Sequence, residues 1–185
     1  MGIFQPLIPT TVESTFVMSF NVGDLTEGQD SYPTMSTSSV APISGLAFSA
    51  EESQYVYDSF QIPNNYVVGS DVGVGVHYFV STTQTGTKNC AWMLNYQTFN
   101  DSDNIYDKVT TTTGVLFELN SDELADTYRK ASFALSATAS GNPLNKDTFL
   151  SFSISRACGC VGDTMADDAI LTLLTFEFLV EVPNG

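Results

Sequence analysis

The chain has 185 residues, 43% of them hydrophobic, and carries 21 acidic against 6 basic side chains, a formal net charge of −15. This balance argues against direct nucleic-acid binding and against an anionic membrane surface, because both partners need Lys and Arg side chains. A chain of this size can bury about 70% of the surface that it exposes when unfolded, which is enough for one domain with a full core. No secretory signal and no membrane-length apolar run is visible, so we expect a soluble protein made in a cytoplasm.

The composition favours β-strands, because Phe, Tyr, Val and Thr are abundant and long windows with helical spacing are absent. Residues 1–10 hold Pro6 and Pro9 among apolar side chains, which predicts an extended arm that packs on its own domain or on a neighbouring subunit. Residues 11–185 are expected to form a single domain. Its eight or nine strands are expected within residues 11–22, 46–49, 54–60, 72–80, 89–99, 108–119, 127–137, 149–154 and 169–182.

Alternating side chains define the faces of the clearest strand, at residues 72–80. Every second side chain there is large and apolar, whereas Gly73 and Gly75 on the other face predict the close approach of another backbone or an aromatic ring. Residues 170–174 are apolar on both faces, which is typical of a central strand.

Turn signals separate the strands and suggest how they pair. We expect a long polar loop over residues 23–45 and a single helical turn near Ser121, which acidic residues follow. Two β-hairpins are expected, one formed by the strands at 72–80 and 89–99 and the other by the last two strands. Together these patterns predict an all-β fold, an antiparallel β-sandwich that is most simply a jelly roll.

His77 is the only histidine, and it lies on the glycine-bearing face of its strand. A Ser-His-Asp triad would need a nucleophile and a carboxylate beside it, and the sequence contains no nucleophile elbow. A structural or surface histidine is the favoured interpretation. Paired carboxylates for glycoside hydrolysis cannot be assigned among so many acids. We therefore expect a protein that is not an enzyme and assign no catalytic residue.

The three cysteines, Cys90, Cys158 and Cys160, are interpreted as free thiols, with a disulfide from Cys90 to one of the other two as the alternative. A zinc site formed by these cysteines and His77 is the weaker interpretation, because one tight pair replaces the usual two pairs of ligands.

Two groups of acidic residues could in principle hold calcium through their carboxylate oxygens. Neither spacing matches an EF-hand, so both are interpreted as solvated turns, and no metal or cofactor is expected. The groups are Asp163, Asp167 and Asp168, and Asp101, Asp103 and Asp107.

Four aromatic residues, Tyr78, Trp92, Tyr96 and Phe99, could form a platform for a sugar. Alternation places the first three on strand faces, so packing in the core is the favoured interpretation. No small-molecule substrate is expected.

One part of the sequence resembles structural proteins of tailed phages and environmental viruses. Residues 62–74 show the pattern, with a proline, Asn, hydrophobes and Gly-Ser before an alternating strand. In those proteins a strand containing tryptophan and an acidic loop follow, as do Ala91-Trp92 and Asn100-Asp101-Ser102-Asp103 here.

The end of the chain carries the rest of the resemblance. A strand ends at Arg156, Gly162-Asp163-Thr164 follows, and an acidic step leads to a closing strand with Phe176-Glu177-Phe178. The likeness covers roughly residues 60–182. The Cys158-Gly159-Cys160 insertion and the loop at residues 31–44 depart from the pattern.

The resemblance implies a β-sandwich virion component without shared catalytic residues. On this basis we expect a capsid decoration (cement) protein that reaches the virion surface after synthesis in the host cytoplasm. Its partners would be the major capsid protein and its own copies, arranged as a homotrimer. The alternatives are a single-jelly-roll major capsid protein, a receptor-binding appendage of the head or tail, and a carbohydrate-active enzyme.

Overall fold

Eleven β-strands and two short 3-10 helices make up the described part of the chain. A computed structural model describes residues 11–27, 32–119, 124–158 and 162–183. The predicted N-terminal arm lies outside these residues, as does the start of the predicted turn at Ser121. Within the described ranges no helix is long and apolar enough to cross a membrane. The elements are β1 (Thr11–Asn21), η1 (Val22–Asp24), β2 (Thr26–Glu27), β3 (Thr34–Thr37), β4 (Ser44–Phe48), β5 (Tyr55–Gln61), β6 (Val72–Val80), β7 (Lys88–Phe99), η2 (Ile105–Asp107), β8 (Thr111–Leu119), β9 (Tyr128–Leu135), β10 (Phe149–Arg156) and β11 (Ala169–Pro183).

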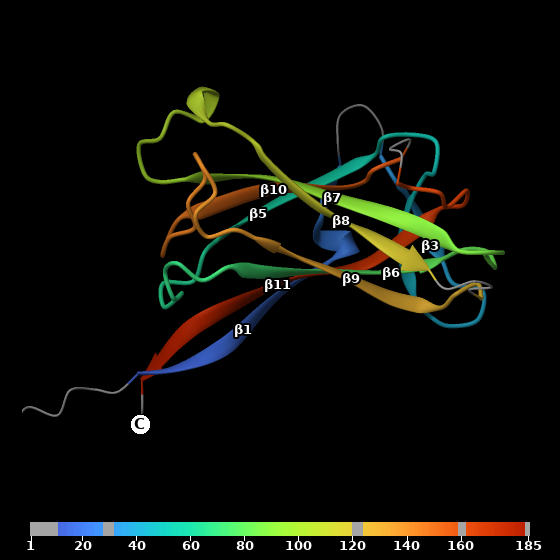
Figure 1. The fold of residues 1–185 in the computed structure, drawn as a ribbon, viewed down its shortest axis with the longest axis horizontal. Helices are drawn as coiled ribbons and strands as arrows, with labels where there is room; N and C mark the ends of the chain where they lie inside the picture. The colour runs from blue at the N-terminus through green and yellow to red at the C-terminus, as the bar shows by residue number, and fades with distance from the viewer. Residues whose placement is uncertain (1–10, 28–31, 120–123, 159–161, 184–185) are drawn as a thin grey trace, which may run out of the picture.

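The strands form two antiparallel sheets packed face to face (Figure 1). Sheet A has the order β3-β4-β11-β6-β9, with β1 also paired to β11, and sheet B has the order β2-β5-β10-β7-β8. The eight strands from β4 to β11 therefore supply β4-β11-β6-β9 to one layer and β5-β10-β7-β8 to the other. This is the two-sheet, eight-strand arrangement of a jelly roll, so the predicted fold class is confirmed.

The core lies between the sheets and follows from the alternation of side chains. The apolar face predicted for residues 72–80 is buried throughout, and β11 is a central strand of sheet A, as expected. Phe20, Phe60, Phe152 and Phe176 meet at the centre, with ring centroids 4.8–6.1 Å apart. These rings come from both sheets, so the cluster joins the two layers through favourable tilted and edge contacts.

The pairing predicted for the two hairpins is wrong, although the strands themselves are correct. β6 pairs with β11 and β9 in sheet A, whereas β7 pairs with β10 and β8 in sheet B. β10 and β11 likewise belong to opposite sheets. Alternation shows which face of a strand is buried, but two strands that face each other across a core have the same pattern as two strands of a hairpin.

The polar loop predicted over residues 23–45 contains more regular structure than expected. Residues 22–24 form η1, the two-residue strand β2 pairs with β5, and β3 pairs with β4. β3 has the sequence Thr-Met-Ser-Thr and is mostly exposed at the edge of sheet A. A short polar edge strand has no apolar alternation by which to recognise it.

The glycines of β6 make room for neighbouring side chains. A Cβ atom at Gly75 would lie 2.5 Å from Thr175 Oγ1 and 2.6 Å from Lys130 Cε, and one at Gly73 would lie 3.3 Å from Glu177 Cβ. The predicted close approach is therefore present. The predicted neighbour, a backbone or an aromatic ring, is wrong, because side chains from the flanking strands β9 and β11 occupy the space.

A buried ion pair fixes the Gly-Asp-Thr turn that follows β10. Arg156 donates from Nε and Nη2 to the two carboxylate oxygens of Asp163, at 2.9 and 2.7 Å, and both side chains are at most 2% exposed. Asp163 also accepts from the Ala91 amide, and Thr164 Oγ1 accepts from the Asn89 amide. Burial is the largest single influence and would lower the pKa of Arg156, but the hydrogen bond to Asp163 and the neighbouring negative charges together raise the pKa. The turn thus ties the end of β10 to the start of β7.

Candidate functional site

β1 and β11 continue together beyond the rest of sheet A as a two-stranded extension (Figure 1). We call residues 11–17 and 177–183 the projecting ribbon. β6 pairs with β11 only as far as Glu177. Past Glu177, residues 65–67 form backbone hydrogen bonds with the same edge of β11. The other edge of β1 has no strand beside it in the described part of the chain.

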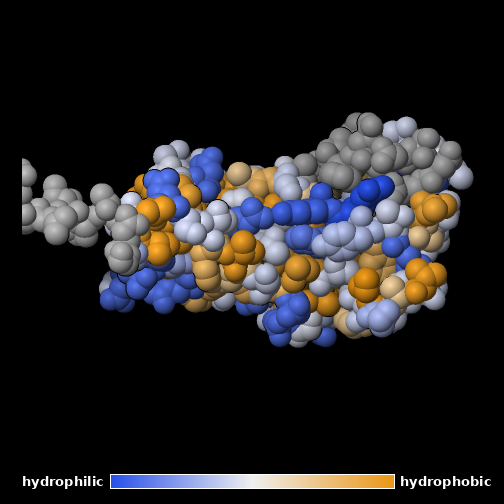
Figure 2. All heavy atoms as spheres, turned by 90° about the horizontal axis from the view of Figure 1, so that it is seen from below, coloured by the Kyte–Doolittle hydropathy of each residue, from blue (hydrophilic) through white to orange (hydrophobic). Residues whose placement is uncertain are grey.

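Apolar side chains are exposed on the projecting ribbon. Val12, Phe16, Val17 and Val182 are 41–51% exposed. The register places Val12, Phe16 and Val182 on one face of the ribbon. Farther along β1, the same face carries Phe20, which packs against the core. Figure 2 shows hydrophobic side chains at this end of the molecule and a hydrophilic band along the middle of the same view. The apolar face of sheet A therefore continues past the sandwich into solvent.

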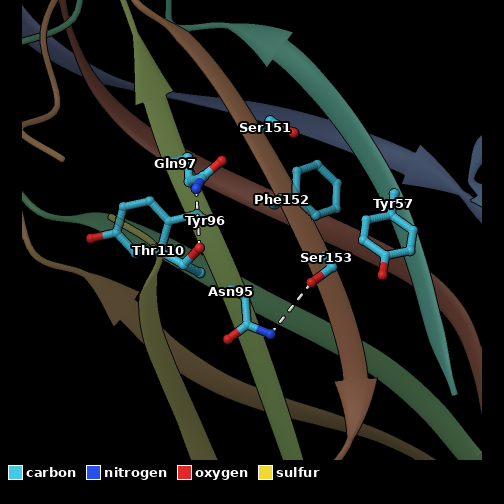
Figure 3. A pocket seen from close by; sticks show the side chains of 8 residues that line it. All are labelled: Tyr57, Asn95, Tyr96, Gln97, Thr110, Ser151, Phe152 and Ser153. Atoms are coloured by element: carbon cyan, nitrogen blue, oxygen red, sulfur yellow. Dashed lines mark hydrogen bonds between the residues drawn. The ribbon is translucent and has the colours of Figure 1, made fainter. Parts of the chain in front are cut away.

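The second surface is a groove along β10 on the outer face of sheet B (Figure 3). The short side chains of Ser151 and Ser153 form its floor. Tyr57 of β5 stands on one side, and Asn95 and Gln97 of β7 stand on the other, because the register places each serine between these strands. This part of the groove has a volume of about 130 Å³.

Hydrogen bonds hold the two amides of the groove in position. Asn95 Oδ1 accepts from Thr112 Oγ1 at 2.6 Å, and Asn95 Nδ2 donates to Ser153 Oγ at 3.4 Å. Gln97 Nε2 donates to Thr110 Oγ1 at 3.1 Å, and its carboxamide oxygen is turned toward β10 (Figure 3). Side chains that are already fixed lose little conformational entropy when a ligand binds.

The groove widens toward the end of the sandwich at which β7 leaves for η2. This wider part has a volume of about 580 Å³ and meets the narrower part at Ser151, which lines both. The volume lies within the range of small-ligand sites. Its lining residues are Gln61, Phe99, Asn100, Asp101, Asp103, Ile105, Asp147, Phe149 and Ser151. We call both parts together the β10 groove.

His77 lies on the outer face of sheet A, away from the β10 groove. Its Nδ1 contacts the Tyr128 hydroxyl, and its Nε2 lies 3.3 Å from Thr175 Oγ1. Thr175 is buried and its hydroxyl also donates to the Gly75 carbonyl oxygen, so it is not presented to a substrate. Burial, and secondarily the charge of Lys130, lowers the pKa of His77, which favours the neutral ring.

The residues weighed as metal ligands are not brought together by the described structure. No group of three or more His, Cys, Asp or Glu side chains suited to a metal is found among the described residues. Both carboxylate oxygens of Asp163 bind Arg156, and Asp167 accepts from Gln84 at 2.9 Å. Asp103 forms an ion pair with Lys108 at 2.6 Å.

The cysteines are placed only in part. Cys90 is buried in the core, and Cys158 carries a free thiol whose sulfur lies 3.5 Å from Ser53 Oγ. Cys160 lies outside the described residues, so the prediction of free thiols stays a prediction.

The four aromatic residues weighed as a sugar platform lie partly in the core and partly on the surface. Tyr78, Trp92 and Tyr96 are buried, as the favoured interpretation required, whereas Phe99 lines the wider part of the β10 groove. Tyr57 and the serines of β10 were not singled out from the sequence. Their signal was present as the outward positions of alternating strands, but it becomes visible only once β5, β10 and β7 are known to be neighbours.

Comparison with known proteins leaves the family open. No family model matches the chain, and no curated protein matches it. Among solved structures, a CBM35 from Cellvibrio japonicus Abf62 is similar, with a TM-score of 0.43 and 8% identity over 93% of this chain and 99% of that one. The xylan-binding module CBM15 has a TM-score of 0.42 and 16% identity, covering 90% and 97%.

A structure of infectious bursal disease virus, Gt strain, is also similar, with a TM-score of 0.33 and 13% identity over 92% of this chain and 42% of that one. At such scores and identities, none of these likenesses supports a conclusion about what this chain binds.

Proposed function

We propose that the protein is a non-catalytic structural component of a virus particle, a decoration subunit that binds the major capsid protein on the outside of the shell. The observation that carries this proposal is the projecting ribbon. Among the described residues its β1 edge has no strand beside it and its apolar side chains are exposed, and a protein neighbour would satisfy both. The resemblance of residues 60–182 to virion structural proteins supports the same function.

The edge of β1 is well suited to pair with a strand of a neighbour. Soluble proteins usually protect such edges with Lys, Pro or a bulge. β1 contains neither Lys nor Pro, its register with β11 is unbroken, and Glu13 is its only charged residue. A strand added to this edge would gain backbone hydrogen bonds, while Val12, Phe16 and Val17 would supply apolar contacts.

A capsid position on the outer surface fits the charge. A net charge of −15 would be repelled by packaged nucleic acid, so an outward-facing decoration subunit is favoured over a major capsid protein that encloses the genome. We propose a homotrimer, in which the projecting ribbons contact the shell or each other.

Charged substitutions on the ribbon test the proposal. Val12→Lys and Val17→Lys change side chains that are about half exposed, so the melting temperature should stay unchanged. The wild-type protein should be a trimer by size-exclusion chromatography with light scattering and should co-sediment with expanded capsids of the cognate virus. The double variant should bind capsids at least tenfold more weakly.

Val40→Lys is the matched control, because Val40 is 78% exposed in the turn between β3 and β4. This variant should bind capsids like the wild type. A monomeric wild-type protein without capsid affinity would overturn the proposal.

A further inference from the structure

We propose that the β10 groove binds a neutral oligosaccharide. This inference rests on the outer face of sheet B alone and is independent of the projecting ribbon. It would hold for a virion protein that attaches to a glycan, and equally if the capsid assignment were wrong.

The groove is polar without being charged along its narrow part. Its outward side chains carry hydroxyls and carboxamides, and no Lys, Arg, Asp or Glu is among the residues that line this part. Ser151, Asn95, Gln97 and Thr110 supply the polar groups, while Ser153 is buried beneath them and accepts from the Asn95 amide. Hydroxyls and amides donate and accept hydrogen bonds at once, which matches the hydroxyl groups of a sugar. A ligand with a formal charge would find no counter-ion here.

Charge in the wider part excludes anionic ligands. Asp101, Asp103 and Asp147 line it, and the nearby cation, Lys108, is held by Asp103 at 2.6 Å. Phosphates, uronic acids and sialic acids would therefore be repelled, as would nucleic acid. Among polyhydroxylated ligands this leaves a neutral chain.

Aromatic side chains are exposed at two points along the groove. Tyr57 is 42% exposed beside the narrow part, and Phe149 is 45% exposed in the wider part, next to Phe99. Tyr57 is level with Ser153, so Phe149 lies four residues farther along β10, about 13 Å away. That distance exceeds one sugar ring and suits a short chain, whose apolar ring faces can lie against both aromatic side chains.

A protein partner is less well matched to this surface. The centre of a protein interface is depleted in polar groups and rich in large apolar side chains, whereas the floor of this groove is serine. Side chains of a partner would bury the Asn95 and Gln97 amides, and those amides would then need new hydrogen-bond partners.

The test is a glycan array that carries neutral and acidic oligosaccharides, followed by isothermal titration with the best neutral chain. We expect binding to neutral chains only. Tyr57→Ala should weaken the affinity about tenfold by removing one aromatic face. Ser151→Arg should abolish binding, because a long cationic side chain would fill the groove where its two parts meet.

Tyr128→Ala is the matched control, because Tyr128 is a similarly exposed tyrosine on the outer face of sheet A. It should leave the affinity unchanged, and a thermal melt of each variant confirms that the fold persists. Three results would overturn the inference: an array without any bound neutral glycan, binding confined to acidic glycans, or neutral-glycan affinity unaffected by both Tyr57→Ala and Ser151→Arg.

Discussion

The two outer faces of the sandwich are built from the same kind of antiparallel sheet, yet one is closed by its own side chains and the other is open. On sheet A, Lys130 of β9 and Glu177 of β11 reach across the glycines of β6 and form an ion pair at 2.8 Å. On sheet B, the strand between β5 and β7 carries Ser151 and Ser153. Ser153 is buried beside the Asn95 amide, but Ser151 stays partly exposed and lines both parts of the β10 groove.

The difference shows that a strand with small side chains forms a groove only where the side chains of the flanking strands leave the space above it open. Small residues occur on both central strands, as Gly73 and Gly75 on β6 and as serines on β10. Long charged neighbours fill the space above the glycines. The amides beside the serines instead form hydrogen bonds with Thr110 and Thr112 of the neighbouring segment, so the groove stays open at Ser151.

The largest loss of stability is expected from breaking the Arg156–Asp163 ion pair, which holds β10 and β7 together in sheet B. Asp163→Asn removes the charge partner of the buried Arg156 and should lower the free energy of unfolding by about 3–5 kcal/mol. Urea unfolding followed by tryptophan fluorescence measures it, with Asp126→Asn on the surface as control. A loss below about 1 kcal/mol, as for an exposed pair, would contradict the structural role of this turn.

A matched pair of valine substitutions compares the two faces directly. Gly75→Val places a side chain where a Cβ alone would lie 2.5 Å from Thr175 Oγ1, and should cost about 1–3 kcal/mol of unfolding free energy. Ser151→Val on the open face should change stability by no more than about 0.5 kcal/mol. Equal losses in the two variants, measured by urea unfolding, would show that the faces do not differ in packing.

The ion pair that closes sheet A should contribute little energy. Lys130 and Glu177 are each 40% exposed, and pairs of this kind contribute about 0–1 kcal/mol. Glu177→Gln should therefore lower the free energy of unfolding by less than about 1 kcal/mol, and added salt should reduce the difference. A larger loss that persists in high salt would mean that the closed face stabilises the fold more than its exposure indicates.

The smallest expected effect is a pH dependence arising from His77 on the closed face. Its folded pKa is lowered, by burial first, so the unfolded chain takes up a proton at a higher pH than the folded protein does. Stability should therefore be full above the unfolded pKa of about 6.5 and should decrease as the pH falls below it. His77→Gln should remove this part of the slope. Identical slopes for the two proteins in urea unfolding between about pH 5 and 8 would contradict it.

The strands and the buried faces could be read from the sequence because alternation depends on local order alone. The apolar face of residues 72–80 and the core positions of Trp92 and Tyr96 were correct for this reason. Strand partners could not be read, because the crossing from β6 to β7 and a hairpin turn have the same local signals. The short strands β2 and β3 were missed, since polar edge strands bury almost nothing.

The candidate sites depended on that missing pairing. Tyr57, Asn95 and Ser153 are at least 38 residues apart in the sequence. They form one row across the sheet only because β10 lies between β5 and β7. The Arg156–Asp163 pair was hidden for another reason. Both residues were noted in the sequence, but only the fold shows that they are buried together. The acidic composition argued against nucleic acid and anionic membranes as partners, and it did not indicate which surface could bind.

The most direct test of the account is an electron cryo-microscopy reconstruction of expanded capsids of the cognate virus saturated with the protein. We expect ordered subunits at fixed positions, with the projecting ribbon against the shell or a neighbouring subunit and the β10 groove facing solvent. Capsids that stay bare, or bound subunits whose ribbon points into solvent, would contradict it.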